Sequence, residues 1–115
     1  MNVKIWVDDV RAAPEGYVWC KSVNEARLTI VKCENETSFN VSDDWISKIE
    51  LTPIELIDTD HDAGDYAVDG GDYIKLLDWL EATNRNYPIR IHSANPVGAA
   101  NMRRIIQRNR WTEVK

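Results

Sequence analysis

Short apolar runs alternate with longer amphipathic stretches along this chain of 115 residues. The apolar runs are rich in β-branched and aromatic side chains and stop abruptly at polar or turn-forming residues, which is typical of buried strands. This pattern predicts strands at residues 3–7, 17–20, 54–57 and 89–91.

The stretches after the second, third and fourth of these strands carry apolar residues at helical spacing. Ser22 and Glu25 form a capping box ahead of the first stretch. Asn95 is a good N-cap, and Pro96 is favoured at the first position of a helix. The predicted helices therefore span residues 23–33, residues 72–82 and the stretch that begins at residues 95–96.

Strands that alternate with helices are the signature of a parallel sheet covered by helices, so we expect one α/β domain over residues 1–115. The expected fold has three layers around a short parallel sheet of about four strands. Its first strand is central, with the second and third on either side. Hydrophobic residues make up 43% of the chain and charged residues 29%, which is ordinary for a globular domain and excludes long disorder.

The charge balance narrows the possible partners and locations. Fourteen Lys and Arg stand against nineteen Asp and Glu, a net charge of -5, so non-specific binding to duplex nucleic acid is not expected. An acidic pair lies near the N-terminus, where a signal peptide would be apolar, and no stretch approaches the roughly 20 apolar residues of a membrane span. Cys20 and Cys33 have no framework spacing and are expected to be reduced. These features predict a cytoplasmic protein without a membrane segment.

Polar clusters follow three of the predicted strands, at Asp8-Asp9, at Asp60-His61-Asp62 and at His92-Ser93-Ala94-Asn95. Open parallel sheets bind ligands at their carboxyl edge, where the strand order reverses, so the clusters should converge there. Carboxylates that share one edge repel one another unless a cation neutralises them, and oxygen ligands suit Mg²⁺ or Mn²⁺. Asp8, Asp9 and Asp60 are therefore candidate metal ligands. The alternative is that these aspartates only terminate strands.

His61 and His92 are the only histidines in the chain, and both lie in these clusters. A histidine titrates near neutral pH, so either one is a candidate acid or base, with a structural hydrogen-bonding role as the alternative. The helix start at Asn95 offers the amides of Val97 and Gly98 to an anion such as phosphate, and Gly98 would allow a close approach. A simple helix cap is the alternative there.

The acidic motifs resemble the two-component receiver domain, in which an acidic pair and an aspartate bind Mg²⁺, the aspartate is phosphorylated and a hydroxyl residue contacts the phosphoryl group. A closer resemblance, over nearly the full length, is to the cyclic-phosphate processing receiver domain. Its motifs are VDDVR at 7–11, APEG at 13–16, DHD at 60–62 and HSANPVG at 92–98.

This resemblance implies a receiver-like, flavodoxin-like strand order. It leaves residues 34–53 as an insertion, in which a short helix is predicted after Ser42. The receiver's fifth strand, which ends in a lysine, is expected to be missing.

The implied function is a metal-assisted phosphoesterase, a hydrolase that acts on cyclic phosphate ends of RNA or on cyclic nucleotides. Its partner would be a small phosphorylated substrate or an RNA end, and its cofactor Mg²⁺ or Mn²⁺. The catalytic residues would be Asp60, His61 and His92. The phosphate would be held by Ser93, Asn95, Val97, Gly98 and Arg11.

The sequence leaves two other functions open. The domain could be a non-catalytic receiver-like module that binds a partner protein or a nucleotide, although two histidines at the predicted edge favour the enzyme. An ordinary phosphorylated receiver is disfavoured, because the fifth-strand lysine is expected to be missing.

Overall fold

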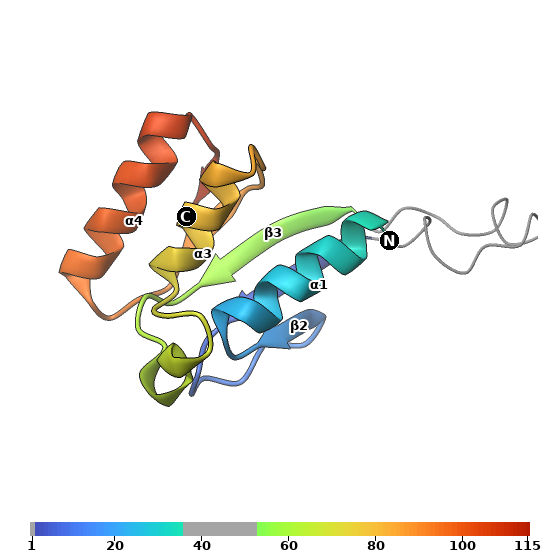
Figure 1. The fold of residues 1–115 in the computed structure, drawn as a ribbon, viewed down its shortest axis with the longest axis horizontal. Coiled ribbons are helices and arrows are strands. Elements are labelled where there is room, and N and C mark those ends of the chain that lie inside the picture. The colour runs from blue at the N-terminus through green and yellow to red at the C-terminus, as the bar shows by residue number, and fades with distance from the viewer. Residues whose placement is uncertain (1, 36–52) are drawn as a thin grey trace, which may run out of the picture.

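The computed structural model describes residues 2–35 and 53–115, and these form an α/β fold (Figure 1). The short helix predicted after Ser42, and most of the predicted insertion, lie outside the described residues. The elements, in chain order, are β1 (Val3–Val7), β2 (Tyr17–Cys20), α1 (Val23–Asn35), β3 (Ile54–Thr59), the 3₁₀ helix η2 (Gly64–Val68), α3 (Ile74–Ala82), β4 (Ile89–Ile91), α4 (Pro96–Asn109) and β5 (Glu113–Val114).

Within the described residues, the sheet has five parallel strands in the order β2-β1-β3-β4-β5. The central position of β1 and the flavodoxin-like order agree with the prediction, but a sheet of about four strands that lacks the fifth is wrong. β5 pairs with β4, with Glu113 opposite Ile89 and Val114 opposite Arg90. Two residues with one apolar side chain are too short to give a strand pattern, so only this pairing reveals β5. Lys115 follows β5 directly.

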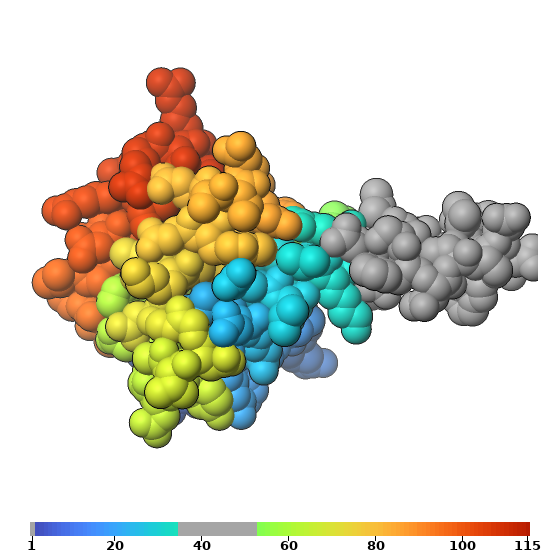
Figure 2. Space-filling model, in the orientation of Figure 1, coloured from blue at the N-terminus to red at the C-terminus, as the bar shows by residue number. Residues whose placement is uncertain are grey.

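The three α-helices of the described residues cover one face of the sheet, so the prediction of three layers is also wrong for this part of the chain. The connections from β2 to β3, β3 to β4 and β4 to β5 all run across the sheet in the same direction. Right-handed crossovers in one direction put every helix on the same side. α3 contacts both α1 and α4, and Figure 2 shows the three helices side by side on this face.

The core lies between this layer of helices and the sheet. Ile5, Ile57 and Ile89 stand opposite one another on adjacent strands and are fully buried. They belong to one apolar cluster with Leu77 of α3 and Met102 of α4. Each of these side chains contributes about 1.5–3 kcal/mol through burial, so the alternating strand residues hold the sheet against the helices.

The other face of the sheet carries Trp6, Asp58 and Arg90 at matching positions. Trp6 is only 8% exposed and Asp58 is fully buried, although the described α-helices lie on the opposite side. The indole Nε1 of Trp6 donates a hydrogen bond to the Arg11 carbonyl at 2.9 Å. This bond holds the connection between β1 and β2 against the ring.

The start of α1 follows the predicted capping box in part. The Ser22 hydroxyl accepts a hydrogen bond from the Glu25 amide at 3.0 Å, as expected. The Glu25 carboxylate accepts from the amide of Lys21 instead of that of Ser22, one residue earlier than predicted. None of the helices within residues 2–35 and 53–115 is long and apolar enough to span a bilayer.

The end of α1 extends beyond its predicted limit at residue 33. Glu34 lies inside the helix and pairs with Arg85 at 2.8 Å. This ion pair ties the end of α1 to the segment that leads into β4. The first residues of the predicted insertion therefore belong to the helix.

Candidate functional site

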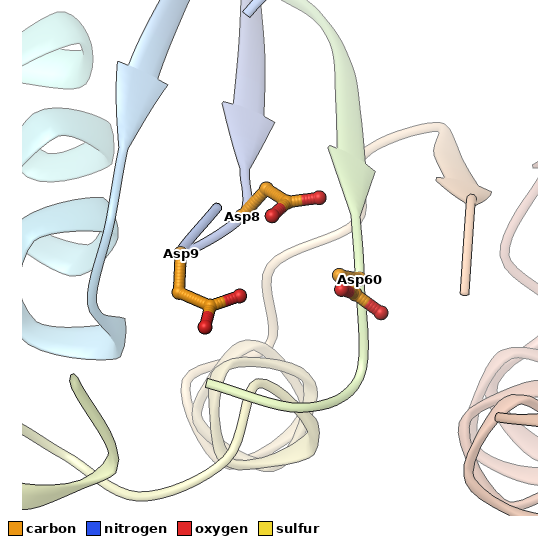
Figure 3. Close-up of side chains that lie close together, drawn as sticks. All are labelled: Asp8, Asp9 and Asp60. Atoms are coloured by element: carbon orange, nitrogen blue, oxygen red, sulfur yellow. The ribbon is translucent and has the colours of Figure 1, made fainter. Parts of the chain in front are cut away.

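The carboxylates of Asp8, Asp9 and Asp60 lie together at the carboxyl edge of the sheet (Figure 3). Asp8 and Asp9 follow β1, and Asp60 follows the adjacent β3. The Asp60 amide donates to the Val7 carbonyl at 2.9 Å, which aligns the two strand ends. One oxygen from each carboxylate can be chosen so that the three lie within 4.8 Å of one another. The three side chains grouped in the sequence analysis thus share one small volume.

The donor set of this cluster fits a hard divalent cation. Three carboxylate oxygens are the ligand type that Mg²⁺ and Mn²⁺ prefer. Burial raises the pKa of Asp9, and the negative charges of Asp8 and Asp60 raise it further. Gly64 packs so closely on Asp9 that a Cβ there would collide with the carboxylate. The segment after β3 therefore holds Asp9 in the cluster. The neighbouring carboxylates repel the charge of Asp9, and a bound cation would offset this repulsion.

Asp8 is buried, and hydrogen bonds fix its carboxylate on two sides. Its Oδ1 accepts from the amides of Val10 and Arg11, both at 2.9 Å, and its Oδ2 lies 2.9 Å from His92 Nε2. Burial alone would raise the pKa of Asp8, but the Arg11 and Val10 amides, together with His92, outweigh it and leave this pKa below its usual value. Asp8 is therefore held ionised and in one orientation.

His92 lies at the end of β4, between two carboxylates. Its Nε2 faces Asp8, and its Nδ1 lies 2.6 Å from Asp58 Oδ1. The ring stacks on Trp6, with centroids 3.8 Å apart and planes 7° from parallel. Asp58 also pairs with Arg90 at 2.9 Å. Both ring nitrogens of His92 are thus engaged within the protein.

Asp58 was not among the residues singled out from the sequence. Asp58 lies one residue beyond the strand predicted at residues 54–57, but the structure extends β3 to Thr59 and so places this acid inside the strand. A buried carboxylate is costly unless it is paired, so its presence in a strand indicates a partner. The sequence offered no way to identify that partner as His92, 34 positions away.

His61 belongs to a second group, at the start of α4. Its Nδ1 lies 2.7 Å from Asp62 Oδ1, and the Asn95 side chain donates to Asp62 at 3.3 Å. The hydrogen bond from His61, followed by that from Asn95, lowers the pKa of Asp62, so this carboxylate accepts the proton on Nδ1. Across residues 2–35 and 53–115, the Nε2 of His61 has no hydrogen-bond partner.

The start of α4 uses some of the groups that the sequence analysis assigned to phosphate. The Asn95 side chain accepts from the Gly98 amide at 2.9 Å, as a helix cap does. The Ser93 hydroxyl accepts from the Asn95 amide at 3.0 Å, which leaves its own proton free to donate. Val97 is 71% exposed at the first turn. The exposed Arg11 side chain donates to the His92 carbonyl at 3.0 Å, which holds it at the same edge.

Gly98 packs directly against His61, so alanine at this position should displace the imidazole. A Cβ at position 98 would collide with ring atoms of His61. We expect Gly98→Ala to destabilise the fold by about 1–3 kcal/mol, the usual cost of overpacking, despite the better helix propensity of alanine. Chemical denaturation measures this loss. In a His61→Ala background the same substitution should cost little, and an equal cost in both backgrounds would contradict the contact.

The family model of the cyclic-phosphate processing receiver domain matches residues 3–108. The chain belongs to this family. No curated protein and no solved structure matches it. In this cyclic-phosphate processing receiver domain, the matched region contains the acidic cluster, both histidines and the start of α4.

Proposed function

We propose that this receiver-like domain is a metal-assisted phosphoesterase that opens cyclic phosphates at RNA ends or in nucleotides. The observation that carries the proposal is the convergence of Asp8, Asp9 and Asp60 at the ligand-binding edge of a domain from this family. Two histidines and a helix start lie at the same edge and supply the other groups that phosphate chemistry needs.

Asp8, Asp9 and Asp60 would hold Mg²⁺ or Mn²⁺ through their carboxylate oxygens. When bound, the cation would polarise the phosphoryl oxygens and offset the charge that develops on them. The fixed orientation of Asp8, with backbone amides on one oxygen and His92 on the other, favours a preorganised ligand set.

Proton transfer is assigned to His61 rather than to His92, a choice that the sequence analysis left open. Asp62 accepts a hydrogen bond from the Nδ1–H of His61. The Nε2 of His61 is therefore available to a water molecule or to the leaving oxygen. Both nitrogens of His92 already face buried carboxylates. The role assigned to His92 is therefore to hold Asp8.

The reaction adds water across one phosphorus–oxygen bond. The water oxygen bonds to phosphorus, the bond to the 2′ or 3′ oxygen breaks, and the proton from water ends on that leaving oxygen. Ser93 can donate its hydroxyl proton to a phosphate oxygen, and Arg11 retains guanidinium N–H groups for the same purpose. The amide of Val97 at the start of α4 adds a third donor.

Phosphorus NMR provides the test, with 2′,3′-cyclic nucleotides and short RNAs with cyclic ends as substrates, in the presence of Mg²⁺ or Mn²⁺. We expect the cyclic phosphate signal to be replaced by that of a monoester, and Asp60→Asn should abolish the conversion. If folded wild-type protein leaves every one of these substrates intact, the phosphoesterase proposal fails. A non-catalytic module would then be the better account.

Ordinary receiver chemistry is the competing function, because β5 is present and Lys115 follows it. The sequence disfavoured a phosphorylated receiver because a lysine after the fifth strand was expected to be missing, whereas β5 pairs with β4 and is followed by Lys115. Intact-mass spectrometry after incubation with acetyl phosphate and Mg²⁺ separates the two functions. A phosphoesterase leaves the mass unchanged, whereas a receiver gains one phosphoryl group on Asp60.

A further inference from the structure

We propose that Asp58 is a positioning residue, which, together with Trp6, fixes the His92 ring so that its Nε2 faces Asp8. This inference rests on the proposed function only where it reaches the cation. Its structural part concerns the metal-free protein and stands on the contacts among these four side chains.

The first step is the placement of Asp58. It lies on β3 opposite Arg90 of β4, on the sheet face away from the described α-helices, and it is fully buried. The His92 amide donates to the Thr59 carbonyl at 3.0 Å, which carries the β3–β4 alignment one residue beyond β4. His92 thereby lies on the same face as Asp58. A carboxylate buried within a strand needs strong partners, and this one has two.

Second, the two carboxylate oxygens of Asp58 contact different partners. Oδ1 lies 2.6 Å from His92 Nδ1, and Oδ2 accepts from Arg90 at 2.9 Å. The Arg90 side chain is 44% exposed, whereas that of His92 is 8% exposed. Water can therefore replace Asp58 as the hydrogen-bond partner of Arg90 at little cost, but water cannot readily reach the Nδ1 of His92. The contact with His92 is the one that burial enforces.

The third step is the orientation of the ring. The stack on Trp6, with planes 7° from parallel, sets the plane of the imidazole. The hydrogen bond to Asp58 sets the rotation of the ring within that plane. With both fixed, Nε2 points at Asp8 Oδ2, 2.9 Å away. Neither contact alone would define this direction.

The consequence reaches the acidic cluster through Asp8. Groups that orient a ligand from behind typically change metal affinity or activity by about 10–100-fold when they are removed. Asp58 is absent from the three-carboxylate cluster, so it would act on the cation only through His92. Loss of Asp58 should therefore loosen Asp8 without removing any ligand.

The experiment uses proton NMR of the metal-free chain of 115 residues. With only two histidines in the chain, the carbon-bound ring protons of His92 are readily assigned. In wild type the Trp6 ring current should shift them upfield. Asp58→Ala should change how this upfield shift is divided between the two ring protons, because only the contact with Asp8 then keeps the ring from turning over the face of Trp6. Asp58→Asn keeps an oxygen that accepts from Nδ1, so it should preserve the shift.

Arg90→Met is the matched control, since it breaks the other contact of Asp58 and leaves His92 untouched. It should preserve the upfield shift. If Asp58→Ala does not fold, Asp58→Ser replaces it. A serine hydroxyl is too short to reach Nδ1, so this variant should show the same change in the shifts of the two ring protons. If the chemical shifts of the His92 ring protons (the His92 signature) are unchanged in the folded Ala or Ser variant, the proposal is overturned.

Titration with Mn²⁺ alone then tests the link to the cation. Asp58→Ala, or Asp58→Ser in its place, should weaken Mn²⁺ binding by about 10–100-fold, with Asp58→Asn and Arg90→Met close to wild type. If wild type itself binds no Mn²⁺, the proposed function fails, while the NMR comparison still decides the role of Asp58. If the variant with a changed His92 signature binds Mn²⁺ as tightly as wild type, the positioning of Asp8 through His92 is refuted.

Discussion

Replacing His61 by alanine should lower the turnover of a 2′,3′-cyclic phosphate by about 10²–10⁴-fold, the usual contribution of a general acid or base. The Nδ1–H of His61 donates a hydrogen bond to Asp62, and the side chain of His61 is 14% exposed. We therefore expect the Nε2 of His61 to exchange protons with the substrate or with water at the edge of the sheet. The measurement is the initial rate from phosphorus NMR, with circular dichroism to verify the fold. Cation affinity should stay unchanged, because His61 is not in the three-carboxylate cluster.

His92→Ala is the informative comparison for this prediction. His92 contacts Asp8 directly, so its loss should lower turnover and cation affinity together. Asp62→Asn should have a smaller effect than His61→Ala, since an amide oxygen still accepts the Nδ1 proton. Turnover that survives His61→Ala but not His92→Ala would reverse the two assigned roles.

Divalent cations should stabilise the folded protein strongly. At a Mg²⁺ concentration about 100 times Kd, the free energy of unfolding should rise by ~2.7 kcal/mol, because the ligand set exists only in the folded state. For a domain of this size, such a gain in the free energy of unfolding should raise Tm by about 10 °C. Thermal denaturation with and without Mg²⁺ or Mn²⁺ measures the shift.

Asp60→Asn should remove most of this response. The same substitution should raise the stability of the metal-free protein, since it takes one charge out of a repelling group that also raises the pKa of Asp9. Asp65→Asn, which alters an exposed acid of η2 outside the cluster, is the matched control and should respond to Mg²⁺ as wild type does. An equal cation response in Asp60→Asn and wild type would show that the cluster is not the binding site.

Local patterns predicted most elements of the fold. Segments of three to five mostly apolar residues predicted β1 to β4, and the cap at Asn95 predicted the start of α4, because strand burial and helix capping depend on neighbouring residues. β5 escaped detection, since its two residues become a strand only by pairing with β4. The sequence also did not predict that the helices of residues 2–35 and 53–115 form a single layer, because this follows from the direction of each crossover and from the lack of a helix between β1 and β2.

The sequence by itself determined the identity of the acidic edge. Asp8, Asp9 and Asp60 follow the ends of β1 and β3, and parallel neighbours present their carboxyl ends at one edge, so their proximity needed no further information. The tertiary structure alone decided what each histidine contacts. Asp58 meets His92 across 34 positions and Trp6 stacks on the same ring, whereas His61 turns to Asp62 and Gly98. Such contacts depend on strand register and side-chain rotamers, which are set only when distant segments pack.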